Sequence, residues 1–365
     1  MTERATARGD ERTSLEGTRA DVLICGASFA GLAVARELAG AGADVLLIDR
    51  YAIGERQTSA CAVPEGWLEQ MGAQRSLRAV LPDMTFTTPH GTVRYRLPWR
   101  WAAFDYRTLC EDLFAQCDAR FETAKVDGRT GFTVHTDRGD LHAPLIVDAL
   151  GWRRVLAKDG YQPPDAPLSR GLEVHPGVKA NPPTHHALDV WVDRTLAPRG
   201  FAWRVPAGEE ERIGVGSYEP RHHVREPTED LAGRLGARAE RWQGNWFPHQ
   251  LRPAAEDGVF FCGDSAGHCF PLSGEGIRTA FHFGIAAGRE LREVLAGTQT
   301  REQALERYGA FSAGHGKAFR RALRLQRLIP ALPPRLLTVL LRALKPQPFV
   351  DRMFGWYLAQ APPRR

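Results

Sequence analysis

The 365-residue sequence lacks any apolar run long enough to cross a lipid bilayer. The longest strongly apolar stretch in its C-terminal third, residues 336–341, is far shorter than the roughly 20 residues that a membrane-spanning helix needs. The six cysteines include no C-x-x-C pair and no tandem spacing of zinc ligands. These absences argue against a transmembrane protein, a disulfide framework and a structural zinc site. We therefore expect a cytoplasmic protein that holds no metal.

Acidic residues are scarce at one end of the chain. Residues 317–365 contain eleven lysines and arginines but one acid, Asp351, whereas the net charge of the whole chain is +5. The rest of the chain is therefore mildly acidic. Because the basic residues do not form a recognisable nucleic-acid motif, we expect no nucleic-acid partner. Residues 1–19 mix acids and arginines without an apolar core, which predicts a disordered tail rather than a targeting segment.

The first motif present is a strand, a glycine-bearing turn, a helix and a second strand within residues 21–49. Residues 21–25 and 45–49 are short apolar runs typical of buried parallel strands, and residues 32–39 are good helix formers. The turn reads G-x-S-x-x-G, a dinucleotide fingerprint with serine in the second glycine position. Free N–H groups at the helix start would face a pyrophosphate, and the acid that ends the second strand would accept ribose hydroxyls. This segment predicts a nucleotide site that contains Gly26, Ser28, Ala30, Gly31, Asp49 and Arg50.

A second glycine-bearing motif lies far downstream and indicates FAD. The apolar residues 259–262 lead into Gly263 and Asp264, where a short acidic side chain can bind a polyol hydroxyl. The turn at residues 273–276 then opens a helix whose positive end would face negative charge on a reduced flavin. FAD needs both features, because it carries a ribityl chain and becomes anionic when it is reduced. We expect this cofactor to contact Asp264, Gly274, Gly276 and Ile277.

The sequence has no second dinucleotide fingerprint. Gly214 and Gly216 lack a third glycine and a following helix, so we interpret residues 214–219 as strand and turn. Electrons would then come from NAD(P)H that binds transiently beside the flavin, or from a protein reductant. The sequence leaves both donors open.

The middle of the chain has a different pattern from its first 50 residues. Residues 85–105 and 161–249 contain short apolar runs broken by proline and glycine, which is typical of antiparallel strands. Residues 121–148 are expected to be strands that return to the first sheet, and the chain is helical from residue 277 onward. We predict an α/β protein with a Rossmann-like FAD-binding domain (20–84, 106–160 and 250–300), an interleaved antiparallel-sheet substrate domain (85–105 and 161–249) and a basic helical C-terminal region (301–365).

The two glycine motifs, together with P-x-x-G-x-G-I at residues 271–277, resemble flavoproteins of the p-hydroxybenzoate hydroxylase-like fold, and among them the geranylgeranyl reductase family. Residues 146–152 resemble the strand-and-glycine motif of that family near the FAD pyrophosphate, with D-A-L-G in place of the usual D-G. Residues 200–206 resemble its aromatic-x-Trp-x-aliphatic-Pro element beside the active site. The resemblance covers roughly residues 20–300.

The resemblance implies a flavin ring between the FAD-binding domain and the antiparallel sheet. Trp203 and Phe201, with Trp191, would then form an apolar wall of the substrate pocket. A position in the core of the sheet is the alternative for Trp191. The family also has an arginine near the FAD phosphates at the position of Arg107, where a planar cation suits the task. An exposed surface position is the alternative for Arg107.

The resemblance also implies a catalytic cysteine. Geranylgeranyl reductases carry one in a loop that matches residues 56–64, so Cys61 would lie close to the flavin and the substrate. The usual following glycine is replaced by Ala62. A thiol there could protonate one carbon while flavin N5 delivers hydride to its neighbour. The alternative role of Cys61 is an apolar filler.

Three functions fit these motifs. The first is a reductase that saturates C=C bonds of an isoprenoid lipid or a prenyl quinone. The second is a flavin-dependent monooxygenase or halogenase acting on an aromatic or apolar substrate, although the lysine-bearing loop that halogenases place between residues 60 and 90 has no match. The third is a non-redox FAD protein such as a carotenoid cyclase.

The basic C-terminal region combines leucines and arginines in helical segments. Such segments can lie peripherally at an anionic membrane surface or cover a long apolar channel. An ordinary packed helix pair with a solvated basic face is the third interpretation. The sequence leaves the three open.

Overall fold

The structure is a computed structural model that describes residues 12–57, 59–157, 168–176 and 186–363. Its first layer is a six-stranded sheet with the strand order β17-β18-β11-β2-β3-β7, in which all neighbours are parallel except β17 and β18. Strands β2 and β11 are buried along their whole length, as is usual for parallel strands with both faces covered. The bounds are β2 (Val22–Cys25), β3 (Val45–Asp49), β7 (Arg120–Thr123), β11 (Leu145–Asp148), β17 (Ala255–Glu256) and β18 (Val259–Phe261).

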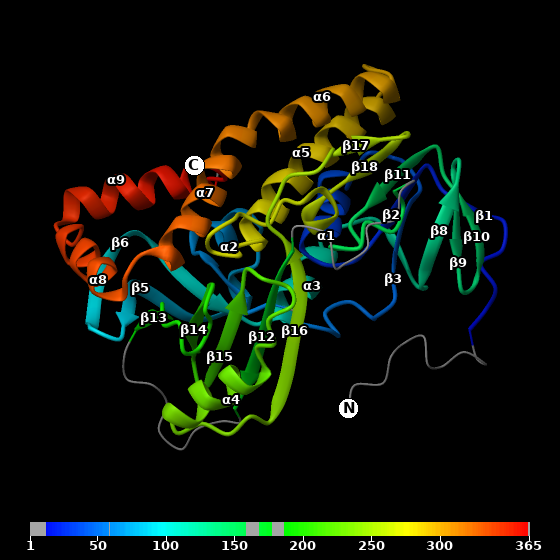
Figure 1. Ribbon diagram of the computed structural model, residues 1–365. Helices are drawn as coiled ribbons and strands as arrows, with labels where there is room; N and C mark the ends of the chain where they lie inside the picture. Colours follow the sequence, from blue (N-terminus) through cyan, green and yellow to red (C-terminus); the bar gives the residue numbers. More distant parts are fainter. Residues whose placement is uncertain (1–11, 58, 158–167, 177–185, 364–365) are drawn as a thin grey trace.

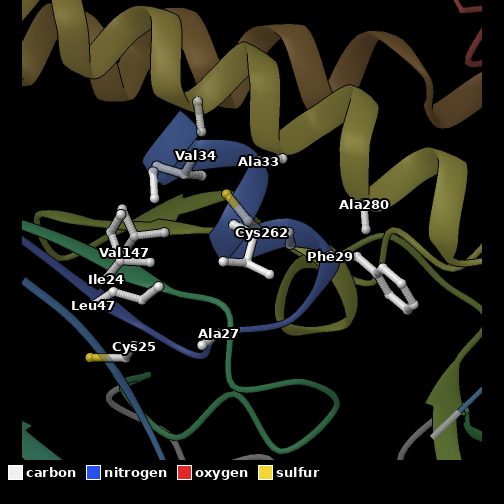
Figure 2. Packing of buried hydrophobic residues seen from close by; sticks show 14 of the residues in the cluster. Ile24, Cys25, Ala27, Phe29, Ala33, Val34, Leu47, Val147, Cys262 and Ala280 are labelled. Carbon is white, nitrogen blue, oxygen red and sulfur yellow. The ribbon is translucent and has the colours of Figure 1, made fainter. Parts of the chain in front are cut away.

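Helix α1 (Phe29–Glu37) lies between this sheet and the long helix α5 (Ile277–Leu295). Figure 2 shows α1 with the strand residues Ile24 and Val147 on one side and Ala280 of α5 on the other. Residues 21–49 therefore form the predicted strand, turn, helix and strand. The other helices of this part are α2 (Gly66–Gln70), α3 (Tyr106–Phe114) and α6 (Arg301–Gly314), with the short 3-10 helices η3 (Gln74–Ser76) and η4 (Gly263–Ala266).

Two glycines of α5 allow it to approach α1 closely. A Cβ atom at Gly284 would lie 2.8 Å from the backbone oxygen of Ala30, and one at Gly288 would lie 2.6 Å from Cβ of Glu37. Real Cβ atoms do not come that close, so larger residues at these positions would separate the helices. The contact fixes the start of α5 beside the start of α1.

The second layer is an eight-stranded sheet with the order β16-β12-β15-β14-β13-β5-β6-β4, antiparallel except where β13 meets β5. Helix α4 (Arg225–Arg234) covers one face of it, below the sheet in Figure 1. Strand β5 begins before the predicted domain boundary at residue 85, so that boundary is too late. The bounds are β4 (Ala62–Pro64), β5 (Leu77–Thr88), β6 (Gly91–Phe104), β12 (Leu168–His175), β13 (Ala187–Trp191), β14 (Gly200–Ala207), β15 (Glu210–Ser217) and β16 (Arg241–Pro248).

A third sheet of four short strands corrects two expectations. Strands β8 (Val126–Thr130), β9 (Thr133–Thr136) and β10 (Gly139–His142) form it with β1 (Thr18–Arg19), so of the strands within residues 121–148 only β11 and part of β7 join the first sheet. Residues 12–19, expected in the disordered tail, pack here: the backbone N–H of Leu15 donates to the carbonyl of Arg138 at 2.7 Å. Residues 1–11 lie outside the described residues.

The C-terminal region consists of α7 (Gly316–Leu328), η5 (Ile329–Ala331), α8 (Pro334–Ala343) and α9 (Gln347–Leu358). Helices α8 and α9 pack on β5 and β6, at the left of Figure 1. The hydroxyl of Tyr95 in β6 donates to the carbonyl of Leu341 in α8 at 2.7 Å. Among the described helices, none has the length and apolarity that a bilayer span requires.

Candidate functional site

A cavity of about 1410 Å³ lies between the six-stranded sheet, the eight-stranded sheet and the C-terminal helices. Pockets for one small molecule usually have volumes of about 300–1,000 Å³, so this cavity has room for a cofactor and a substrate together. Its lining comes from the start of α1, the end of β3, the turn before α5, one face of the eight-stranded sheet and helices α7 to α9.

The turn before α1 forms the first end of the cavity. Gly26 has a φ of +111°, and a Cβ there would lie 2.3 Å from the backbone oxygen of Ala149. A Cβ at Gly31 would lie 1.8 Å from the backbone oxygen of Gly26. These two glycines therefore hold the turn against its neighbours, while Ser28 and Ala30 line the cavity.

The first turn of α1 is available to a ligand. Ser28 is the N-cap residue, yet among the described residues its side chain makes no capping hydrogen bond to the helix. Its hydroxyl instead accepts a hydrogen bond from the hydroxyl of Tyr106 at 3.1 Å. Helix starts carry N–H groups without partners in the helix, and their partial positive charge suits a phosphate. The donor set fits the pyrophosphate of a dinucleotide.

Asp49 and Arg50 follow β3 at the same end and line the cavity. Asp49 accepts hydrogen bonds from the backbone N–H groups of Ala27 at 2.8 Å and Tyr51 at 3.0 Å. Burial raises the pKa of Asp49 above its ordinary value although both bonds lower it. One carboxylate thus fixes the turn and faces the nucleotide end of the cavity.

Arg107 is not placed as the family resemblance implies. Its side chain is exposed, and it is absent from the described residues that line the cavity. Its main chain packs on Gly54, where a Cβ would lie 2.8 Å from Cα of Arg107. Its position is thus that of the surface alternative. The cavity is lined instead by arginines that the sequence analysis did not single out, among them Arg56, which begins the loop 56–64, and Arg153, which directly follows the motif 146–152.

The downstream turn meets the first turn. Gly263 has a φ of +62°, and a Cβ there would lie 3.0 Å from Cβ of Ala30. Asp264 follows it in η4 and lines the cavity, where burial raises its carboxyl pKa to about 6 although the nearby charge of Arg252 lowers it. The two glycine-bearing turns, which the sequence predicted to converge, lie side by side at the cavity.

The turn that opens α5 completes this end. Gly274, Gly276 and Ile277 line the cavity. Gly276 is the N-cap residue of α5, so among the described residues no side chain caps the start of this helix. Gly274 has a φ of +65°, and a Cβ there would lie 3.0 Å from the ring of Phe247. Two uncapped helix starts thus face one cavity, which fits a cofactor with a pyrophosphate at one end and an anionic ring at the other.

Trp203 and Phe201 of β14 line the cavity. The indole of Trp203 lies over the G-x-G of β15: a Cβ at Gly214 would come 2.3 Å from its Cζ2 atom, and one at Gly216 would come 3.2 Å from its Cζ3 atom. Those glycines, which do not form a dinucleotide fingerprint, provide a flat surface for the ring. Trp191 belongs to the hydrophobic cluster on the α4 side of the sheet, so its core alternative holds.

Cys61 is not placed for catalysis. It has a φ of 52° and is fully buried, and its thiol donates to the backbone oxygen of Ser59 at 3.3 Å. Among the described residues its neighbours Ala60 and Ala62 line the cavity, but Cys61 does not. Burial raises the pKa of this thiol far above its ordinary value. The left-handed backbone turns the side chain into the core.

Glu173 and Gln243 line the cavity and were missed by the sequence reasoning. Glu173 stands on β12 and accepts a hydrogen bond from Nε1 of Trp203 at 2.6 Å. Gln243 on β16 donates to the other carboxylate oxygen at 2.5 Å. Neither residue belongs to a sequence motif, because their contacts join strands that are distant along the chain.

The far end of the cavity is apolar. Residues from three strands of the eight-stranded sheet face residues from the C-terminal helices across it. Hydrocarbon side chains of this kind suit an apolar substrate, because burying its surface removes it from water. The lining residues of this end are Met84, Phe86, Leu188, Val190, Val205, Leu328, Leu337, Leu340, Leu341, Leu344, Phe349 and Phe354.

Comparisons with known proteins agree with this site. A family model described as an FAD binding domain matches residues 19–96. Digeranylgeranylglycerophospholipid reductase 1 of Methanothermobacter thermautotrophicus is 25% identical over 313 residues, which are 74% of this chain and 77% of that protein. A geranylgeranyl bacteriochlorophyll reductase-like protein of Thermoplasma acidophilum has a similar solved structure, with a TM-score of 0.79 and 16% identity over 95% of this chain and 97% of its own.

The fold extends to other flavoproteins. The solved structure of a probable FAD-dependent monooxygenase from Pseudomonas aeruginosa has a TM-score of 0.65 and 18% identity, and the similarity covers 93% of this chain and 100% of the other. That likeness concerns the fold alone. The matched FAD-binding segment contains the turn before α1 and Asp49, and the predicted fold class, with its helical C-terminal region, is confirmed. The chain is therefore an FAD-dependent oxidoreductase that is similar to geranylgeranyl reductases.

Proposed function

We propose that the protein saturates C=C bonds of an isoprenoid lipid or a prenyl quinone. One observation carries the proposal: the cavity continues from the two glycine-bearing turns into an apolar end between the eight-stranded sheet and helices α7 to α9. A long hydrocarbon chain can lie there with one double bond next to the flavin. The names of similar proteins, which include digeranylgeranylglycerophospholipid reductase, support the same substrate class.

Bound FAD would supply the hydride from its N5 atom. We assign the turn before α1, with Ser28, Ala30 and Asp49, to the pyrophosphate and ribose. Asp264 would accept hydroxyl groups of the ribityl chain. The start of α5, at Gly276 and Ile277, would stabilise the negative charge of the reduced ring, because a helix N-terminus carries partial positive charge.

Trp203 and Phe201 would line the reaction chamber and exclude water from it. Their rings lie with centroids 5.7 Å apart on the cavity face of β14. A water-free chamber protects the reduced flavin from side reactions and strengthens electrostatic interactions inside. Aromatic faces also attract positive charge that develops on a substrate carbon.

An anaerobic experiment tests the proposal against its alternatives. The flavin is reduced chemically, and a geranylgeranyl lipid or a prenyl quinone is added without air. Reoxidation of the flavin, with a product that has gained two hydrogen atoms per turnover, supports the reductase. Reoxidation only after air is admitted, with oxygen or halogen in the product, identifies a monooxygenase or halogenase. Conversion of substrate at constant flavin oxidation state identifies a non-redox protein such as a carotenoid cyclase.

We propose NAD(P)H or a protein reductant as the electron source. The described lining of the cavity includes Arg50, Arg56 and Arg153, cations that can attract an anionic donor toward the flavin. Anaerobic mixing with NADPH and with NADH separates the two sources. Fast bleaching of the flavin absorbance by either nucleotide identifies that donor. If neither nucleotide bleaches the flavin, the electrons come from a protein.

We propose that the C-terminal helices also contact an anionic membrane, at the cytoplasmic face. Six of the nine large apolar side chains that are exposed among the described residues lie within 328–353, and four of these, Leu328, Leu340, Phe349 and Met353, also line the cavity. Exposed basic side chains surround them, which suits anionic headgroups. These six are Leu328, Leu336, Val339, Leu340, Phe349 and Met353, and the basic ones are Arg324, Arg327, Arg335, Arg342, Lys345 and Arg352.

Sedimentation with vesicles tests the membrane contact. The protein is expected to bind vesicles that contain phosphatidylglycerol, more weakly at high salt, and to leave pure phosphatidylcholine vesicles in solution. Leu336→Ser with Val339→Ser removes exposed apolar surface without changing a cavity-lining residue and should abolish binding. Phe132→Ser removes an exposed aromatic ring on the four-stranded sheet and should leave it intact. Equal binding of all three proteins contradicts the contact.

A further inference from the structure

Strand β12 places two ionisable residues next to each other at the wall of the cavity. Glu173 is 3% exposed and lines the cavity, and His175 is 5% exposed. Oε1 of Glu173 and Nε2 of His175 form a hydrogen bond of 2.7 Å. Residues two apart on a strand share one face of the sheet, so the strand itself sets this pair. Neither of them belongs to the turns that we assign to FAD.

Two more side chains fix the orientation of the carboxyl group. Trp203 Nε1 donates to Oε2 at 2.6 Å, and Gln243 Nε2 donates to Oε1 at 2.5 Å. Gln243 Nε2 also donates to the backbone oxygen of Ser59 at 2.8 Å. The carboxyl group is thus held at the edge of the reaction chamber by side chains from three strands, next to the loop that was expected to supply a catalytic thiol.

The other acids of the described cavity lining have different surroundings. Asp49 lies at the nucleotide end and accepts two backbone N–H groups. Asp264 lies in the turn beside the start of α1, where the ribityl chain is expected. Glu275 forms an ion pair with the buried Arg278, with 2.7 Å between Oε1 and Nε. Of the four acids, Glu173 alone is bonded both to a histidine and to the aromatic wall.

The hydroxyl and thiol groups of the lining are poorer acids. The hydroxyl of Tyr95 donates to the carbonyl of Leu341, and burial raises its pKa to about 12. The hydroxyl of Tyr218 donates to the carbonyl of Leu272, and burial also raises its pKa. Burial raises the pKa of the Cys269 thiol well above its ordinary value. None of these protons is readily transferred to a substrate carbon.

We propose that Glu173 is the proton donor of the C=C reduction and that His175 returns the proton to it. The proposal rests on the proposed function. Trp203 and Gln243 are positioning residues, since they act through the carboxyl group. His175 lies opposite the exposed Arg241 in the register of β12 and β16, so it is the member of the pair nearer to the solvent.

The reaction balances as follows. One carbon of the double bond receives a hydride, with its two electrons, from reduced FAD, which is oxidised. The other carbon receives the proton of the Glu173 carboxyl group, so two C–H bonds replace the π bond and a carboxylate remains. The imidazolium of His175 then transfers a proton from Nε2 to Oε1, and solvent reprotonates the imidazole. The indole face of Trp203 stabilises positive charge on the substrate during the transfer.

Glu173→Gln tests the donor, with Glu211→Gln as the matched control. Glu211 is a buried acid of the same sheet that lies 3.8 Å from Arg204 and is not among the described lining residues. We expect E173Q to keep its FAD and to slow alkene-dependent flavin reoxidation by about 100-fold or more, the usual effect of losing a general acid. E211Q should react at nearly the wild-type rate.

Two further measurements separate catalysis from structure. Infrared difference spectra of the FAD-free protein should contain a carboxyl band that E173Q removes and E211Q keeps. His175→Ala should slow the reaction and regain rate when imidazole is added, which a structural role would not produce.

The outcomes are distinct. A wild-type protein that leaves every prenyl substrate unreduced overturns the proposed function and this inference with it. A wild-type protein that reduces the substrate, with E173Q equally fast, overturns only the role of Glu173. Slow turnover by E211Q as well as E173Q assigns the effect to the stability of the sheet and also overturns it.

Discussion

Arg278 and Glu275 form an ion pair of 2.7 Å between Nε and Oε1 at the start of α5, and the arginine side chain is fully buried. The guanidinium also donates to backbone oxygens at the C-terminal end of α9: to Leu358 at 3.1 Å, to Ala361 at 3.3 Å and to Tyr357 at 3.1 Å. The turn assigned to the flavin and the last helix are therefore held by one side chain.

Replacing Arg278 by Met should destabilise the protein strongly. The change leaves the buried Glu275 without its cation, and breaking a buried pair in this way costs about 3–5 kcal/mol. We expect a lower Tm and faster proteolysis of α9. Chemical denaturation and limited proteolysis measure both effects.

The double variant Glu275→Leu with Arg278→Met should recover part of the loss, because it removes both charges. Arg234→Met, at an exposed ion pair on α4, should cost less than about 1 kcal/mol. If R278M were as stable as R234M, the buried pair would not hold α9.

Gly214→Ala should reduce catalysis without loss of FAD. The new Cβ would come 2.3 Å from Cζ2 of Trp203, so the indole must move away from Glu173. Overpacking of this kind costs about 1–3 kcal/mol of stability, and a displaced reaction geometry can cost up to about 100-fold in rate. Flavin content by absorbance and turnover with a prenyl substrate are the measurements.

Gly233→Ala is the matched control for that prediction. Gly233 lies in α4 and a Cβ there meets nothing within 4 Å, so alanine should be neutral or slightly stabilising. Equal turnover of G214A and G233A would show that the position of the indole does not matter.

The FAD-binding part could be predicted because its signals are local. Strand, turn, helix and strand lie within residues 21–49, and each turn requires glycine where φ is positive, as at Gly26 and Gly263. The proximity of Gly263 and Ala30 was predictable because one long cofactor has to contact both turns. The sequence pattern therefore predicted the FAD-binding part of the fold and most of the residues at one end of the cavity.

The other end of the cavity and the packing of residues 12–19 could not be predicted, because they depend on backbone conformation and on contacts between distant parts of the chain. Cys61 matched a family loop, but a motif does not reveal that its φ of 52° turns the thiol into the core. Glu173 is joined to Trp203 and Gln243, which are 30 and 70 positions away in the chain. Leu15 packs through hydrogen bonds to a hairpin more than a hundred residues later, at Arg138.

Gly26→Ala should weaken FAD binding. Alanine is strained at a φ of +111°, and its Cβ would lie 2.3 Å from the backbone oxygen of Ala149. The turn must then shift at the start of α1, and each 1.4 kcal/mol lost from binding is about tenfold in Kd. Flavin fluorescence during titration of the FAD-free protein measures the affinity.

Gly40→Ala separates the backbone strain from the clash. Gly40 has a φ of +73° and nothing within 4 Å of a Cβ, so alanine there has a similar strain without a contact at the cavity. G40A should lose some stability and keep its affinity for FAD. Equal affinities of G26A and G40A would remove the turn before α1 from the FAD site.

The FAD-free protein should lose stability as the pH rises through the titration of Asp264. Burial raises the pKa of this carboxyl group from 3.8 to about 6, so between these values the folded protein binds a proton that the unfolded chain has released. The favourable contribution is complete below about pH 3.8 and is lost above about pH 6. Asp264→Asn should flatten this part of the pH profile in urea unfolding, whereas the exposed Asp230→Asn on α4 should leave it unchanged. If the stability of the wild type and that of D264N change by the same amount over this interval, the pH dependence belongs to other groups. Weaker FAD binding by D264N would still be expected, since the carboxylate is assigned to the ribityl hydroxyls.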